Sequence, residues 1–330
     1  MITYFLVEEL VRRGHEVTLF ASSDSETSAR LVSICDSQTV NLRDGPQELF
    51  LPYQLLLSKM IVEQSHQFDL IHDNYFETFL LSSFFPFSHC PIVHTIHNDF
   101  FHFKKLKEAM LKIDNQDFYV FISQNAFKAA SEVKNKTFIY NGIDIKLFPF
   151  DKTPDDYFVW LGRLASKKGA REAIEAALEA DVNLRVAAAI DTPAKQEYFD
   201  KEIKPLLGAK IKFEGELDFQ KKIGLLQKAK ALIAPIQWEE PFGLVMVEAM
   251  ACGTPVVAFN RGAAPEIVRN GETGFVVKEG DIKGLVAAIH KINKIERENC
   301  RKYIEENFTI EKMVNAYEEL YRKILGKITI

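Results

Sequence analysis

Two carboxylates stand close together in the segment Trp238–Val257, which reads WEEPFGLVMVEAMACGTPVV. Glu240 precedes a Pro-Phe-Gly turn, and Glu248 follows after seven intervening residues, inside an apolar run that favours a helix. Ionised carboxylates accept hydrogen bonds and do not donate them, so they are good partners for sugar hydroxyls and poor partners for phosphate. The pair therefore indicates recognition of a sugar-containing ligand.

The turn between the two acids predicts a helix start that can bind an anion. Pro241 suits the first turn of a helix, where its missing N–H is not needed. Phe242 and Gly243 would then open the helix and leave its first N–H groups unpaired. Those donors and the helix dipole attract phosphate. A diphosphate held there would lie between groups reached by Glu240 on one side and by Glu248 on the other.

A second phosphate-binding pattern is the loop 162–169, GRLASKKG, which follows an expected strand and precedes an expected helix. Gly162 permits close approach of the backbone to a ligand. Arg163 can bind phosphate oxygens in a bidentate manner, and Lys168 supplies a point charge. Because cations at a helix start oppose the helix dipole, a bound anion explains this loop better than a solvated basic surface does.

Both segments resemble signature elements of the family-four retaining glycosyltransferases, which have the two-domain GT-B fold. The resemblance implies that Glu240 holds the donor sugar and that Glu248 holds the ribose of the nucleotide. It also assigns the diphosphate to Arg163 and Lys168. The residues that it implies in donor binding are Gly162, Phe242, Gly243, Leu244 and Glu248.

The first half of the chain adds a candidate histidine. His97 follows the strand expected at 92–96, and ligands of parallel α/β sheets bind beyond the carboxyl ends of strands. The segments FDLIHDN, PIVHTIHND, FISQNA and YNGIDIKLF resemble their counterparts in the family's N-terminal domain, and the resemblance places His97 close to the donor sugar. For His72 and His94 a structural role is the better interpretation.

The chain also departs from the family pattern. Family members carry a strand and a Gly-Gly loop directly before the segment matching VEELVRRGHEVTLFAS, and the loop faces the nucleotide-sugar; this chain starts inside the corresponding helix. Such a strand would be central in its sheet. Ala189-Ile190-Asp191 stands where the family has a Gly-Lys pair. These differences keep open a non-catalytic or truncated paralogue that binds nucleotide-sugars.

Strand-like and helix-like apolar patterns alternate along the chain, which predicts parallel sheets covered on both faces. The expected strands are 16–20, 68–72, 92–96, 118–122, 137–140, 157–161, 183–189, 210–214, 231–235, 255–259 and 274–277. The expected helices besides the one in the signature are 1–13, 53–64, 104–112, 125–133, 170–180, 195–207, 219–229, 281–294, 301–307 and 308–325.

The fold class expected from this alternation is α/β, and the resemblance makes it GT-B, with two Rossmann-like, doubly wound domains facing an interdomain cleft. A proline-punctuated stretch at 149–154 separates the halves. Residues 1–150 would form the acceptor domain and residues 151–307 the donor domain. The resemblance further implies that the last helix, 308–325, crosses back to complete the first domain.

Composition narrows the class of protein. The 330 residues carry a net charge of −5 and four cysteines without a CxxC pattern, which argues against nucleic acid as a partner, against a disulfide framework and against a zinc site. We find no signal peptide and expect a cytoplasmic protein. The longest apolar run, 79–87, is shorter than the ~20 residues that span a bilayer, although a peripheral membrane contact stays open.

The expected reaction is transfer of a sugar from a nucleotide-diphosphate sugar to a carbohydrate or lipid-linked acceptor. Arg163, Lys168 and the helix start would stabilise the leaving diphosphate. The chain contains no Asp-x-Asp motif, so we expect neither a metal ion nor another cofactor. The resemblance implies retention by attack on the face from which the diphosphate departs. A phosphorylase, which would need a pyridoxal lysine, and a sugar-nucleotide epimerase are the other readings of a GT-B enzyme.

Overall fold

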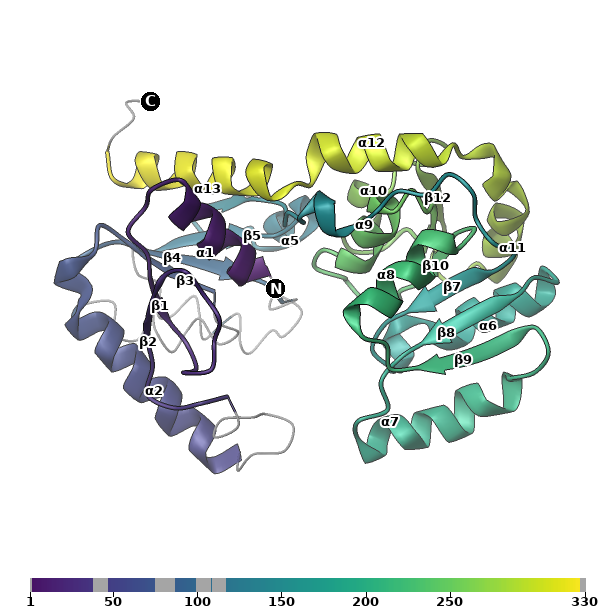
Figure 1. The fold of residues 1–330 in the computed structure, drawn as a ribbon, viewed down its shortest axis with the longest axis horizontal. Coiled ribbons are helices and arrows are strands. Elements are labelled where there is room, and N and C mark those ends of the chain that lie inside the picture. Colours follow the sequence, from purple (N-terminus) through teal and green to yellow (C-terminus); the bar gives the residue numbers. More distant parts are fainter. Residues whose placement is uncertain (1, 38–46, 75–86, 99–107, 109–116, 327–330) are drawn as a thin grey trace. The chain divides into compact units, whose positions relative to one another are not determined.

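The chain divides into two compact units, each built on a parallel sheet (Figure 1). The computed structural model describes residues 2–37, 47–74, 87–98, 108 and 117–326. Unit 1 comprises residues 1–142 and 310–330, and unit 2 comprises residues 143–309. The boundaries predicted from the sequence were 150/151 and 307/308, whereas residues 143–150 and 308–309 lie in unit 2. There the Ile143 N–H donates to the Phe308 carbonyl at 2.9 Å.

Unit 2 contains a six-stranded sheet in which every described pairing is parallel. Its strands are β7 (Phe158–Leu161), β8 (Leu184–Ala187), β9 (Ile211–Gly215), β10 (Leu232–Ala234), β11 (Val256–Phe259) and β12 (Gly274–Val277). The spatial order is β12-β11-β10-β7-β8-β9. The chain therefore starts in the middle, builds one half of the sheet and then the other, which is the doubly wound Rossmann arrangement with its switch point between β7 and β10.

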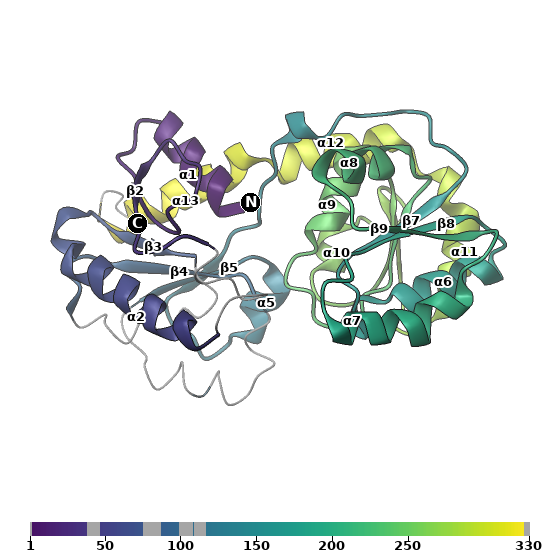
Figure 2. The ribbon, with the colours of Figure 1, turned by 60° about the horizontal axis from the view of Figure 1, so that its bottom comes forward.

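Helices cover both faces of this sheet, with α8, α9 and α12 on one face and α6 and α11 on the other (Figure 2). The helices of unit 2 are α6 (Ala170–Glu179), α7 (Pro193–Tyr198), α8 (Phe219–Lys228), α9 (Leu244–Ala251), α10 (Ala264–Ile267), α11 (Ile282–Lys291) and α12 (Arg297–Asn307). α9 is apolar on nearly all sides, because neighbouring helices and the sheet surround it.

Unit 1 contains two separate parallel sheets. The larger one has the order β3 (Ile71–Asp73), β4 (Ile92–Ile96), β5 (Phe118–Phe121) and β6 (Lys136–Phe138), and the smaller one pairs β1 (Thr18–Phe20) with β2 (Arg30–Val32). The described helices are α1 (Ile2–Arg12), α2 (Gln47–Glu63), α5 (Gln124–Ala129) and α13 (Ile310–Ile324). Both sheets are parallel, as predicted, but no helix separates β1 from β2, and β2 was not predicted.

The core of unit 1 joins its first and last helices. Leu6 of α1 packs in one buried cluster with Val93 of β4, Val120 of β5 and Tyr317 of α13. α13 thus belongs to unit 1, although the preceding helix α12 belongs to unit 2. The face of α13 that enters this cluster carries Met313, Val314 and Tyr317.

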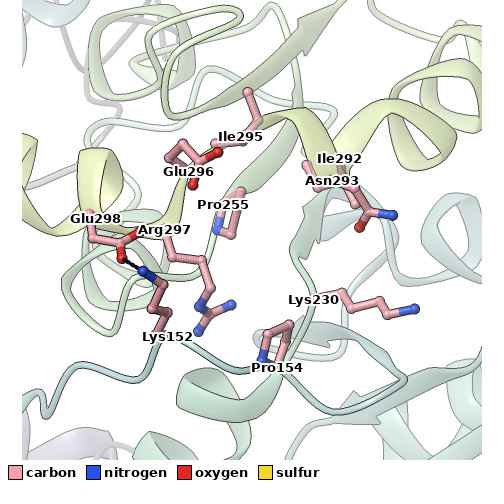
Figure 3. Close-up of a pocket in the computed structure, with 10 residues that line it drawn as sticks. All are labelled: Lys152, Pro154, Lys230, Pro255, Ile292, Asn293, Ile295, Glu296, Arg297 and Glu298. Carbon is pink, nitrogen blue, oxygen red and sulfur yellow. Dashed lines mark ion pairs between the residues drawn. The ribbon is translucent and has the colours of Figure 1, made fainter.

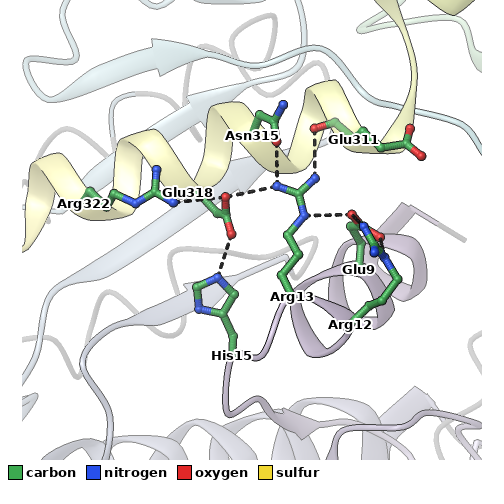
Figure 4. A network of polar contacts seen from close by, with 8 residues as sticks. All are labelled: Glu9, Arg12, Arg13, His15, Glu311, Asn315, Glu318 and Arg322. Atoms are coloured by element: carbon green, nitrogen blue, oxygen red, sulfur yellow. Dashed lines mark hydrogen bonds and ion pairs between the residues drawn. The ribbon is translucent and has the colours of Figure 1, made fainter.

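A polar network at the edge of this core ties α1 to α13 (Figure 4). Arg13 donates to Asn315 Oδ1 at 2.6 Å and to Glu318 Oε2 at 3.1 Å, and its Nε donates to Glu9 at 2.8 Å. Hydrogen bonds from Arg12, and also from Arg13, lower the pKa of the Glu9 carboxyl to about 2 against the cost of its burial. Glu9 therefore stays ionised well below its ordinary range and acts as the fixed anion of the network.

Several predicted elements differ from the observed ones. The helix predicted at 195–207 is regular only to Tyr198 and then continues as a wide turn and a 3₁₀ turn up to Leu206, where Pro205 lacks the donor that an α-helix needs. The predicted helix at 104–112 and the apolar run at 79–87 lie, apart from residues 108 and 87, outside the described residues. Within the described ranges no helix combines the length and apolar character needed to cross a bilayer.

The network in Figure 4 makes a prediction about acid stability. Because the pKa of Glu9 is lower in the folded protein, its contribution is present above the ordinary carboxyl range and is lost as pH falls toward about 2. We expect Glu9→Gln to lower the free energy of unfolding at pH 7 by about 1–2 kcal/mol. Urea unfolding at pH 7 and pH 3 measures this, with the exposed Glu16→Gln as control. A loss that is equally large at pH 3 would contradict the assignment.

Candidate functional site

Two loops that follow the neighbouring strands β7 and β10 form one surface at the switch point of unit 2. The Gln237 N–H donates to the Lys167 carbonyl at 2.9 Å, and the Gln237 side chain donates to the Ser166 carbonyl at 3.3 Å. The indole of Trp160 donates to the Lys168 carbonyl at 3.1 Å. The basic loop and the segment before α9 are therefore held together by the sheet and by direct hydrogen bonds.

Two glycines permit this close approach. Gly169 has φ +76°, and a Cβ there would lie 2.0 Å from the Pro235 carbonyl oxygen. Gly262 has φ +57°, and a Cβ there would lie 2.3 Å from the Glu240 nitrogen. The Ala263 N–H donates to the Glu240 carbonyl at 2.9 Å, so the backbone of Glu240 is fixed from behind. The contact of Gly262 with Glu240 was not predicted from the sequence.

The Glu240 carboxylate meets the basic loop directly. Lys168 Nζ lies 2.5 Å from Glu240 Oε2, and the Trp238 indole donates to the same oxygen at 2.8 Å. The ammonium groups of Lys167 and Lys168 lie 4.0 Å and 4.9 Å from the centre of the Trp238 ring, a cation–π arrangement. The structure thus brings together Lys168 and Glu240, which the sequence predicted for one site. It adds Trp238, which carried no motif signal.

Glu248 lies deeper, on α9. Its side chain is only 5% exposed, and burial raises the pKa of its carboxyl, while Lys222 opposes that rise. Lys222 belongs to α8, and its Nζ lies 2.7 Å from Glu248 Oε1. Sequence reasoning missed Lys222 because a lysine on an amphipathic helix shows no sign of which neighbour it faces.

The start of α9 differs from the prediction. The helix begins at Leu244, with Gly243 as its N-cap at φ +86°, so Pro241 and Phe242 precede the helix and do not open it. Phe242 is buried, and its ring lies 5.9 Å from that of Phe308. The side chain of Phe242 is therefore part of the core. In the first turn of α9 the Met246 N–H donates to the Gly243 carbonyl at 2.9 Å, so the N–H groups of Leu244 and Val245 are the candidate donors to a ligand.

Arg163 and Gly162 directly follow β7. A Cβ at Gly162 would lie 3.3 Å from the Trp160 ring, so the backbone runs close to that indole. Arg163 is exposed, and among the described residues its guanidinium has no ion-pair partner. Arg163 is therefore available to a ligand next to the loop that carries Lys168.

Among the histidines of unit 1, His72 and His97 have a lowered pKa and His94 has a raised one. His97 Nε2 lies 3.0 Å from Asn74 Oδ1, and burial lowers its pKa to about 4, so the ring is neutral near pH 7. His72 bridges Tyr321 and Thr95 at 2.6 Å and 2.7 Å, and burial lowers its pKa to about 3. His72 is thus structural, as expected. His97 lies in the other unit from Glu240, and its role stays a prediction.

His94 is fully buried between two carboxylates. Its ring nitrogens lie 2.9 Å from Asp73 Oδ2 and 2.9 Å from Asp117 Oδ2, and the ring stacks on Tyr119. Burial disfavours the charged ring, but the hydrogen bonds to the two aspartates outweigh that cost and raise the pKa of His94 to about 9. The imidazolium is therefore a cross-link between three segments of unit 1, which agrees with the structural role expected for it.

A pocket and the distribution of potential metal ligands were the other candidates for a site in this protein. A pocket of about 190 Å³ is lined by Lys230 and Pro255, which precede β10 and β11, and by residues of the segment 292–298 (Figure 3). It therefore lies at the amino ends of these strands, away from the loops that follow β7 and β10. In this pocket Arg297 donates to the carbonyls of Asp151, Ala229 and Gln227, and Lys152 pairs with Glu298. The charged side chains of the pocket therefore stabilise the fold. Within the described part of the chain, no group of three or more potential ligands among His, Cys, Asp and Glu is arranged around a metal position.

Comparison with known proteins adds an independent finding. The family model described as Glycosyltransferase Family 4 matches residues 2–147, and the model described as Glycosyl transferases group 1 matches residues 145–308. A glycogen synthase of Mycobacterium tuberculosis (strain ATCC 25618 / H37Rv) is 34% identical over 165 residues, which cover 47% of this chain and 39% of that protein. The putative glycosyltransferase YtcC of Bacillus subtilis (strain 168) is 24% identical over 94% of this chain and 84% of its own length.

Solved structures agree on the fold. Sucrose-phosphate synthase from Thermosynechococcus elongatus has a TM-score of 0.81 at 22% identity and covers 98% of this chain and 92% of its own. Anabaena Alr3699/HepE in complex with UDP and glucose has a TM-score of 0.77 at 20% identity and covers 99% and 95%. The fold class is GT-B, as predicted.

His94 gives a prediction about alkaline stability. Its folded pKa of about 9 lies above the ordinary histidine value, so its stabilising effect is complete below that ordinary value and is lost as pH rises through about 9. We expect His94→Gln to lower the free energy of unfolding at pH 6 by about 3 kcal/mol, because two buried carboxylates lose their counter-charge. Urea unfolding between pH 6 and 9.5 measures the difference, with the exposed His66→Gln as control. A difference that does not shrink toward pH 9.5 would refute the charged cross-link.

Proposed function

The chain belongs to Glycosyltransferase Family 4, and on that premise we propose that it moves a sugar from a nucleotide-diphosphate sugar to an acceptor hydroxyl. The observation that carries the proposal is the contact between Lys168 and Glu240 at the switch point of unit 2. It joins a phosphate-binding cation to a sugar-binding carboxylate at the start of α9. Because the matched part of the glycogen synthase is 39% of that protein, its activity and substrates are not transferred to this chain as such.

The leaving group is a nucleoside diphosphate, and the proposed site stabilises its charge as the bond between the anomeric carbon and the phosphate oxygen breaks. Lys168 has three N–H donors, so it can hold Glu240 with one and phosphate with the others. Arg163 adds a bidentate donor, and the first turn of α9 adds backbone donors. These groups are in place before the reaction, which is what electrostatic stabilisation of a transition state requires.

In this proposal each carboxylate binds one of the two sugars of the donor. Glu240 accepts from hydroxyls of the sugar to be transferred. Glu248, about 6 Å along α9 from its first residue, Leu244, accepts from the ribose. With fixed protein donors neutralising the diphosphate, we propose that transfer needs no metal ion. We also propose retention of configuration by attack of the acceptor on the face from which the diphosphate leaves.

Unit 1 supplies the acceptor side in this proposal. His97 is neutral near pH 7, because its pKa is lowered to about 4 by burial, and a neutral ring can both donate and accept at a sugar hydroxyl. The proposed acceptor is a carbohydrate or a lipid-linked sugar. The proposed place of action is the cytoplasm.

A transfer assay tests the proposed function. The protein is incubated with uridine, guanosine or adenosine diphosphate sugars and with carbohydrate and lipid-linked acceptors, with and without EDTA, and the product is examined by NMR. We expect one donor class to be consumed, the product to keep the anomeric configuration of the donor, and the rate to be unchanged by EDTA. Binding without turnover would favour the alternative, a paralogue that binds nucleotide-sugars without transferring them.

Substitutions at the site separate binding from transfer. We expect Arg163→Ala and Glu248→Ala to weaken nucleotide-sugar affinity by about 10- to 100-fold, because each removes charge-assisted hydrogen bonds. Glu240→Ala should slow transfer by about 100-fold and change nucleotide affinity by less than about threefold. Calorimetric titration and single-turnover rates measure the two effects, with Arg171→Ala of α6 as control. Wild-type values in all three variants would remove the site.

A further inference from the structure

Lys222 of α8 and Glu248 of α9 form a nearly buried ion pair that no sequence motif announced. Lys222 Nζ lies 2.7 Å from Glu248 Oε1, and the side chains are 19% and 5% exposed. Among the described residues, Lys222 is the one hydrogen-bond partner of the Glu248 carboxylate. The other carboxylate oxygen therefore keeps its capacity to accept from a ligand.

The position of Lys222 is set by its own helix. Asp218 caps α8 through the Lys221 N–H, and Phe219 and Lys222 then lie on one face, three residues apart. The Lys222 ammonium lies 5.0 Å from the centre of the Phe219 ring, and Phe219 contacts the fully buried Phe148 at 6.0 Å. The side chain of Lys222 is thus held against the Phe219 ring where it contacts Glu248.

The stability of the fold does not explain why a nearly buried ion pair stands at this position. Taking both charges out of water costs about as much as their attraction returns, so two apolar residues would hold α8 to α9 equally well. A carboxylate without Lys222 would be driven toward its protonated form by the same burial that raises its pKa. A protonated carboxyl donates a hydrogen bond from one oxygen and loses acceptor capacity, whereas ribose hydroxyls require acceptors.

We propose that Lys222 is a positioning residue that keeps Glu248 ionised and oriented toward the ribose, and that it thereby makes the site select ribonucleoside diphosphate sugars over their 2′-deoxy counterparts. This inference rests on the proposed function, since it assumes that the phosphates bind at the start of α9. Lys222 touches neither the phosphates nor the reacting atoms, and it acts through Glu248. The nucleobase plays no part in the selection.

Paired nucleotides test the proposal. Binding of uridine, guanosine and adenosine diphosphates and of their 2′-deoxy forms is measured by calorimetry on the full chain. We expect the wild type to bind the preferred ribonucleotide about tenfold more tightly than its 2′-deoxy form. In Lys222→Met that ratio should fall below about two, while affinity for the 2′-deoxy nucleotide changes by less than about threefold. Lys222→Arg should restore most of the ratio.

The matched control is Lys221→Met on the same helix, because Lys221 is 72% exposed on its side chain and pairs with Asp218. We expect it to keep the wild-type ratio. If Lys222→Met does not fold, Lys222→Gln, which retains a hydrogen-bond donor without the charge, takes its place. Far-UV circular dichroism and the unfolding midpoint check the fold of each variant.

The outcomes separate this inference from the function on which it rests. A wild type that binds none of the nucleotides would overturn the proposed function and the inference together. Nucleotide binding by the wild type with an unchanged ratio in Lys222→Met would overturn the inference alone. So would a variant that weakens ribo- and 2′-deoxynucleotides by the same factor, because that result is expected of a purely structural ion pair.

Discussion

The adjacency of β7 and β10 is the constraint on which the site of unit 2 depends. The two strands are neighbours in space, yet β8 and β9 lie between them in the sequence, so the loops that follow them leave the sheet in opposite directions. The surface between the loops is closed by hydrogen bonds such as that from Gln237 to Lys167. The contact between Lys168 and Glu240 follows from that closure, since it joins residues 72 positions apart in the sequence.

Each of the two carboxylates in this site forms an ion pair with a lysine, but the two lysines differ in their surroundings. Lys168 is 15% exposed and lies on a loop, so it can share its donors between Glu240 and an anion that arrives from solvent. Lys222 approaches Glu248 from a helix with an aromatic support and leaves one carboxylate oxygen open. Each acid of the site therefore has a lysine as counter-charge and still presents an oxygen that can accept a hydrogen bond. In unit 1 the charges at His94 are reversed, since one cation satisfies two buried acids.

The sequence predicted local features well and contacts between distant segments poorly. The strands at Ile92–Ile96 and Gly274–Val277 were predicted with their observed bounds, because continuous β-branched or apolar runs between turn residues leave little ambiguity. The motif also predicted that Lys168 and Glu240 belong to one site. Trp238, Gly262 and Lys222 escaped prediction because their roles come from what other loops and helices bring beside them. The start of α9 was misplaced because Pro241 is compatible with a first turn but does not require one.

In unit 1 the packing of helices α1 and α13 joins strands that do not pair with each other. Among the described residues β1 pairs only with β2, and β3 pairs on one side with β4, so the two sheets share no ladder. Parallel strands with an unpaired edge leave backbone groups without partners in the sheet and hold together less firmly than a continuous sheet. The joining element is α13, which follows unit 2 in the sequence. α13 brings Met313 and Tyr317 into the cluster that also contains Leu6, and its polar face binds Arg13. The core of unit 1 therefore combines segments that precede unit 2 in the sequence with one that follows it.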